Sequence, residues 1–124
     1  MAKVRGIRGA TTADGNTREA ILEATRELLE GLVDANDIDP DDVAAVNFTT
    51  TRDLNAAFPA LAARERMGWD YVALMCGHEM EVPDAQPLCI RVLMLVNTDK
   101  SQQEISNVYL RDAANLRDRS GDGG

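Results

Sequence analysis

The chain has 124 residues, 44% of them apolar, which is enough for one ordinary domain with a single hydrophobic core. Its 21 acidic side chains outnumber 13 Lys and Arg side chains, and the net charge of −8 argues against nucleic acid or a membrane surface as a partner. The sequence has no apolar run long enough to span a membrane and no secretory signal at its N-terminus, so we expect a cytoplasmic protein.

The first half of the chain predicts two strands and one long helix. Residues 3–10 favour a strand. Asn16, followed three residues later by Glu19, resembles a capping box and predicts a helix that runs to about Ala35. Residues 43–50 are rich in β-formers and predict the second strand.

The middle of the chain predicts a second helix and a third strand. Pro59 suits the first position of a helix in "PALAARERMG", which Gly68 closes. The next segment, "WDYVALMC" at 69–76, predicts a strand. Residues 77–87 contain two prolines and predict a loop.

The last third of the chain predicts two more strands. "CIRVLMLVNT" at 89–98 has the strongest strand pattern in the sequence. "SQQE" at 101–104 is a capping box that opens a short helix, and "VYLRDAANL" at 108–116 predicts the fifth strand. We expect one domain over residues 1–117 and a flexible, polar tail over 118–124.

These elements predict an α+β or α/β fold in which a five-stranded mixed β-sheet packs on one long helix plus short helices. Residues 90–96 are apolar on both strand faces, and the predicted helices cover only one face. We therefore expect a partner subunit on the other face.

Arg5, Arg8 and Arg91 lie on predicted strands, where alternation assigns each to a face. Arg8 shares its face with small residues, whereas Arg5 points the other way, toward solvent or a neighbouring acid. Arg91 lies in the most apolar run and needs a partner, because an unpaired buried charge is costly. Either a structural ion pair with Glu79 or Glu81, or an anionic ligand, satisfies that need.

The segment "MCGHEM" at 75–80 contains the only histidine. Cys76, His78 and Glu79 suggest a thiol nucleophile with its base, or a metal site. A catalytic zinc needs three protein ligands, and this hexapeptide alone would have to supply them, so we expect no metal. A strand-end loop with an incidental histidine is the better interpretation. Cys76 and Cys89 are expected to be reduced thiols.

Five blocks together resemble the monofunctional, trimeric α/β-barrel class of chorismate mutase, over about residues 3 to 117. They are "RGIRGATT", "FPALAARE", the Cys-x-x-Glu-Met at 76–80, "CIRVLMLVNTD" and "VYLRDAANLR". The resemblance implies a pseudo-α/β-barrel homotrimer with active sites at its subunit interfaces. It also implies conversion of chorismate to prephenate, toward phenylalanine and tyrosine, without a cofactor.

The same resemblance implies roles for individual residues. Arg8 would hold a substrate carboxylate, and Arg91 would contact the ether oxygen of the breaking bond. Glu79 and Cys76 would lie near the ring hydroxyl, and Tyr109 would bind a carboxylate. Arg91, Glu79 and Arg8 are the implied catalytic residues.

Further residues are implied to bind the substrate. Phe58 and Ala60 would form an apolar wall, and Arg64 would lie near the entrance with Arg117. The remaining implied contacts are Met75, Gly77, His78 and Leu116. The sequence departs from the family at Leu61, where a charge is common, and at Asp118, where proline often follows the tail arginine.

Two alternatives to an enzyme are consistent with the sequence. One is a non-catalytic, trimeric protein of the same fold that binds a small anion through interface arginines. The other is a structural trimer without a ligand.

Overall fold

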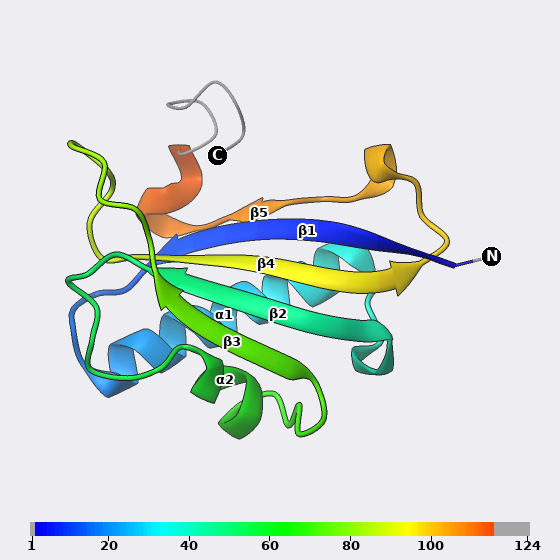
Figure 1. Ribbon diagram of the computed structural model, residues 1–124, viewed down its shortest axis with the longest axis horizontal. Coiled ribbons are helices and arrows are strands. Elements are labelled where there is room, and N and C mark those ends of the chain that lie inside the picture. Colours follow the sequence, from blue (N-terminus) through cyan, green and yellow to red (C-terminus); the bar gives the residue numbers. More distant parts are fainter. Residues whose placement is uncertain (1, 116–124) are drawn as a thin grey trace.

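The computed structural model describes residues 2–115, which form one five-stranded mixed sheet with two α-helices on one of its faces (Figure 1). The strands are β1 (Lys3–Thr12), β2 (Val43–Thr50), β3 (Ala73–His78), β4 (Cys89–Thr98) and β5 (Val108–Tyr109). The helices are α1 (Arg18–Asn36) and α2 (Ala60–Glu65), with 3-10 turns η1 (Pro40–Asp42), η2 (Gln102–Glu104) and η3 (Arg111–Asn115). This confirms the predicted mixed sheet with one long helix and short helices.

The strand order is β3-β2-β4-β1-β5. The central strand β4 runs antiparallel to both β1 and β2, while β2 with β3 and β1 with β5 are parallel pairs. The strand that is most apolar in the sequence therefore lies in the middle of the sheet. Strands β2 and β4 match their predicted bounds, and β1 extends two residues beyond its predicted end.

The start of α1 differs from its prediction. Thr17 is the N-cap, and its hydroxyl accepts a hydrogen bond from the Ala20 N–H at 3.1 Å. The Asn16 Oδ1 instead accepts hydrogen bonds from the backbone N–H groups of residues 55–56, at 2.9 and 3.0 Å. The predicted capping box of Asn16 and Glu19 is therefore wrong, because a loop distant in sequence uses the Asn16 oxygen.

The predicted strand 69–76 is displaced to Ala73–His78. Trp69 is 4% exposed and belongs to the core. Its backbone N–H, however, donates a hydrogen bond to the Ala63 carbonyl at 2.9 Å, in the turn after α2. A hydrophobic residue in a turn was thus mistaken for the start of a strand. At the other end, two residues of the predicted loop 77–87 belong to β3.

Of the predicted fifth strand, 108–116, the structure describes residues 108–115, and only Val108 and Tyr109 of these are in a strand. Arg111 has a φ of 52°, in the left-handed region, and begins the 3-10 turn η3. The Arg111 guanidinium donates to the Thr12 carbonyl at 3.3 Å and pairs with Glu27 at 3.2 Å. These contacts hold the turn against β1 and α1, so the extended backbone ends after Tyr109.

The short helices follow the predicted order. Pro59 precedes α2 as its N-cap residue, one position earlier than predicted, and Gly68 adopts a φ of 70° in the turn that follows the helix. The capping box of Ser101 and Glu104 is present and opens η2, as predicted. The predicted tail 118–124 lies outside the described residues.

The core lies between the helices and one face of the sheet. Ile7, Phe48 and Met94 are fully or almost fully buried there against Leu28 and Leu29 of α1. Large apolar side chains on the opposite face remain exposed, namely Val4 (57%), Met75 (69%) and Leu93 (40%). Within residues 2–115 no α-helix covers that face, which we call the open face, and only Ala113 of η3 packs on one end of it, against Ala10 and Cys89. No helix in this part of the chain is both long and apolar enough to cross a membrane.

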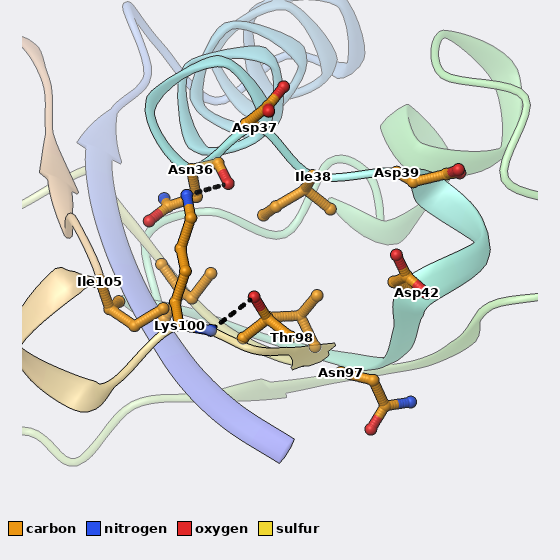
Figure 2. A pocket seen from close by; sticks show the side chains of 11 residues that line it. Asn36, Asp37, Ile38, Asp39, Asp42, Asn97, Thr98, Lys100 and Ile105 are labelled. Atoms are coloured by element: carbon orange, nitrogen blue, oxygen red, sulfur yellow. Dashed lines mark hydrogen bonds between the residues drawn. The ribbon is translucent and has the colours of Figure 1, made fainter. Parts of the chain in front are cut away.

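The C-terminal end of α1 is tied to the segment after β4 (Figure 2). The buried Asn36 amide donates to the carbonyls of Leu32 and Ser106 at 3.0 and 2.8 Å, and its oxygen accepts the Ser106 N–H at 2.8 Å. The Lys100 ammonium donates to the Asn36 carbonyl at 2.6 Å. These bonds hold the chain that leads into β5, so that β5 can pair with β1.

Candidate active site

A hollow of about 320 Å³ lies on the open face, where β1, β2, β4 and β5 meet. Its volume falls within the range of small-molecule sites. We call it the open-face hollow, and its lining is Arg8, Gly9, Ala10, Asn47, Thr49, Glu79, Arg91, Val92, Leu93 and Tyr109.

Two guanidinium groups meet in this hollow because of the register between β1 and β4. Arg91 pairs with Ala10, and Arg8 pairs with Leu93, so the two arginines are diagonal neighbours on one face. Arg5 points to the other face, and its Nε donates to the Lys100 carbonyl at 3.0 Å. The predicted face of Arg5 is therefore right, and the guanidinium is partly exposed while one of its N–H groups bonds to a backbone carbonyl.

The carboxylate nearest to Arg91 is Glu79. The Arg91 Nε lies 4.0 Å from the Glu79 Oε2, and the two side chains are 38% and 32% exposed. Glu81 instead pairs with Arg52 at 2.7 Å. Arg91 is thus less buried than its apolar strand suggested, and its ion pair is too long to occupy the guanidinium fully.

Tyr109 contributes a hydroxyl that has no hydrogen-bond partner among residues 2–115, although the oxygen is buried. The backbone of Tyr109 is held in place because Tyr109 pairs with Ala10 of β1. The backbone N–H of Leu110 also donates a hydrogen bond to the Ala10 carbonyl at 2.9 Å. A buried hydroxyl without a partner is destabilising, and a ligand oxygen would satisfy it. With two guanidinium groups against one carboxylate, the lining suits an anionic ligand.

A second hollow of about 520 Å³ lies beside the loop before α2, and we call it the Phe58 hollow. Phe58 is 69% exposed at its edge, and Cys76, Gly77 and His78 also line it. Burial raises the pKa of the Cys76 thiol, so the thiol stays neutral and is poorly suited to be a nucleophile. The His78 Nδ1 lies 3.1 Å from the Thr50 hydroxyl. In one chain, Cys76 and Glu79 therefore line different hollows.

Among residues 2–115, the other implied substrate contacts, Ala60, Arg64 and Met75, line neither hollow. Ala60 packs partly buried against the core, and Met75 is exposed on the open face. The Arg64 guanidinium donates to two carbonyl oxygens of the turn after α2, at 2.8 and 2.6 Å. Leu116 and Arg117 lie outside the described residues.

Asn47 and Thr49 line the open-face hollow but were missed by the sequence analysis. Both alternate with buried residues of β2, and this signal assigns them to the face opposite the core. The sequence does not reveal which strand lies beside β2, so their proximity to Arg91 could not be inferred from it.

A third hollow, of about 40 Å³, lies at the far end of the sheet (Figure 2). Asp37, Asp39 and Asp42 line it, and the ammonium of Lys100 is already bonded to a carbonyl. This space is large enough for water but not for an organic ligand. Among the described residues, no group of three or more His, Cys, Asp and Glu side chains could hold a metal ion.

The fold and the open-face hollow together define an α+β protein with a hollow whose lining suits a small organic anion. Residues 4–120 match the family model described as chorismate mutase type I. The chain belongs to this family, which confirms the resemblance drawn from the five sequence blocks and, with it, the predicted class of enzyme, an isomerase. The match does not favour the two non-catalytic alternatives.

Individual proteins support the same assignment. The chain is 46% identical over 114 residues to the chorismate mutase AroH of Bacillus subtilis, with coverage of 92% of this chain and 90% of that protein. It is 51% identical over 115 residues to the chorismate mutase AroH of Thermus thermophilus, with coverage of 92% and 93%. The solved chorismate mutase from Clostridium thermocellum superimposes with a TM-score of 0.86 at 49% identity, over 88% of this chain and 96% of that chain.

Proposed function

We propose that this chain converts chorismate to prephenate in the open-face hollow, with Arg91, Glu79 and Arg8 as catalytic residues. The observation that carries the proposal is that Arg91, Glu79, Arg8 and Tyr109 line one hollow in a member of this family.

Substrate binding follows from charge. Chorismate carries two carboxylates, and the hollow offers two guanidinium groups and the Tyr109 hydroxyl. Arg8 and Tyr109 bind carboxylate oxygens, which also gives the buried Tyr109 hydroxyl a partner that residues 2–115 do not supply. Glu79 accepts a hydrogen bond from the ring hydroxyl of the substrate.

The reaction is intramolecular: the ether C–O bond breaks and a new C–C bond forms within the same molecule. It needs no nucleophile, cofactor or obligatory proton transfer. Because the C–O bond breaks ahead of C–C bond formation, negative charge grows on the ether oxygen in the transition state. A guanidinium already in place at that oxygen, that of Arg91, binds the transition state more tightly than the substrate. Restricting the flexible side chain of the substrate over the ring lowers the entropic part of the barrier.

The active assembly is a homotrimer with its sites at subunit interfaces. The exposed apolar side chains of the open face, including Leu93 and Met75, support a covering partner there. Because Phe58 and Cys76 line a hollow separate from that of Arg91 in one chain, a neighbouring subunit is needed to bring them to the same substrate. Light scattering at micromolar concentration is expected to give the mass of three chains, and a monomer would contradict the interface site.

The direct test follows chorismate consumption by ultraviolet absorbance, with purified protein and no additive. Loss of absorbance with formation of prephenate is the expected result. Calorimetry on the same preparation distinguishes the enzyme from a non-catalytic protein that binds a small anion. The non-catalytic protein would bind chorismate without converting it.

A further inference from the structure

Thr49 contacts the carboxylate of Glu79 directly. The Thr49 hydroxyl donates to the Glu79 Oε2 at 2.8 Å, which is an ordinary length for a strong hydrogen bond. The other carboxylate oxygen, Oε1, accepts a hydrogen bond from the backbone N–H of Met80 at 3.2 Å. The backbone N–H of Glu79 donates a hydrogen bond to the Thr50 carbonyl at 2.8 Å. Backbone and side chain of Glu79 are thus both held by the end of β2.

The sheet register places Thr49 between the two groups that it could influence. Thr49 pairs with Arg91 on β4 and with Gly77 on β3, two residues before Glu79. A β-branched side chain has few rotamers, so the direction of its hydroxyl is well defined. Thr49 therefore stands beside Arg91 and fixes where the Glu79 carboxylate lies.

The distances indicate what this contact does. An unrestrained Arg and carboxylate pair closes to about 2.8 Å, often with two parallel hydrogen bonds. Here the Arg91 Nε stays 4.0 Å from the same Oε2 that accepts the Thr49 hydroxyl. The hydroxyl occupies part of the acceptor capacity of Oε2 and holds it away from the guanidinium.

We propose that Thr49 is a positioning residue that holds Glu79 apart from Arg91, so that both groups face the substrate rather than each other. This inference rests on the proposed function for its effect on rate. Its effect on geometry is independent of which reaction occurs in the hollow.

The test compares Thr49→Val, which keeps the shape of the side chain but removes the hydroxyl, with Thr49→Ser, which keeps the hydroxyl. Without the hydroxyl, Glu79 closes on Arg91, and kcat is expected to fall about 10-fold, the equivalent of one hydrogen bond to a charged group. KM changes less, because the contact between Arg91 and the ether oxygen matters most in the transition state. Thr49→Ser is expected to restore kcat to within about 2-fold of the wild type, since its hydroxyl makes the same bond.

Thr11→Val is the matched control, because it makes the same chemical change at a fully buried threonine outside the open-face hollow. It is expected to leave kcat unchanged. A crystal structure of Thr49→Val supplies a readout other than activity, and the Glu79 to Arg91 distance is expected to shorten from 4.0 Å to a direct hydrogen bond.

The outcomes separate the two proposals. A wild-type protein without turnover of chorismate would refute the proposed function, and the crystal structure of Thr49→Val would still decide the positioning role. An active wild type with an unchanged kcat in Thr49→Val, or an unchanged Glu79 to Arg91 distance, would overturn the role of Thr49. Equal losses in Thr49→Val and Thr49→Ser would also overturn it, because the hydroxyl would then not be the cause.

Discussion

Replacing Arg91 with alanine tests the catalytic role against a structural one, because the two roles predict different magnitudes. The Arg91 Nε lies 4.0 Å from the Glu79 Oε2, and both side chains are about one-third exposed. Ion pairs of this kind contribute about 0–1 kcal/mol to folding, whereas breaking a buried pair costs about 3–5 kcal/mol. The geometry therefore predicts a free energy of unfolding that falls by no more than about 1 kcal/mol in Arg91→Ala.

The expected effect on rate is much larger. If Arg91 stabilises the charge that grows on the ether oxygen, its loss resembles the loss of one oxyanion-hole donor, which lowers kcat by about 10²-fold or more. Steady-state kinetics and thermal unfolding on the same preparation measure both quantities.

Arg52→Ala is the control for Arg91→Ala, because Arg52 pairs with Glu81 at 2.7 Å outside the open-face hollow. It is expected to leave kcat unchanged. An Arg91→Ala protein that unfolds far earlier than the wild type, yet keeps a near-normal kcat per folded molecule, would refute the catalytic role.

Further substitutions test other features of the same structure. Tyr109→Phe removes a hydroxyl that no residue of 2–115 bonds, so KM should rise about 10-fold with no loss of stability, and a lower Tm at unchanged KM would contradict this. Thr11→Val removes a buried hydroxyl that has no partner among residues 2–115, and urea unfolding should show a gain of about 1 kcal/mol; a loss would mean that the hydroxyl is bonded. Asn36→Ala deletes the side-chain hydrogen bonds to the Ser106 backbone and should lower the free energy of unfolding by about 2 kcal/mol. An unchanged urea midpoint would show that these hydrogen bonds do not stabilise the fold. Because the rearrangement needs no metal, activity should survive chelation and dialysis, and restoration by added divalent cations would oppose the mechanism.

Local sequence predicted on which face of its strand an arginine lies. Strand alternation assigned Arg8 and Arg5 to opposite faces. In the structure Arg8 lines the open-face hollow, whereas Arg5 lies on the other face and bonds to the Lys100 carbonyl. The conjunction of five ordered blocks identified the family, although no single block would have been specific. The environment of Arg91 was predicted less well, because an apolar strand can present one face to the core and leave the other exposed.

Local sequence determined the elements whose signals lie within a few residues. The apolar run of β4, the long amphipathic pattern of α1 and the capping box of η2 are of this kind, and all three form as predicted. Contacts distant in sequence decided the rest. Thr17 rather than Asn16 caps α1 because a loop about 40 positions away takes the Asn16 oxygen.

The tertiary structure also decided the composition of the open-face hollow. The strand order brings β2 and β1 to either side of β4, and this pairing sets Thr49 beside Arg91 with Arg8 on the diagonal. Alternation along a strand specifies a face but not a neighbour, because the neighbour depends on which strands pair and in what register. The sequence could therefore name the charged groups of the site, while only the folded sheet could bring the Thr49 hydroxyl to the Glu79 carboxylate.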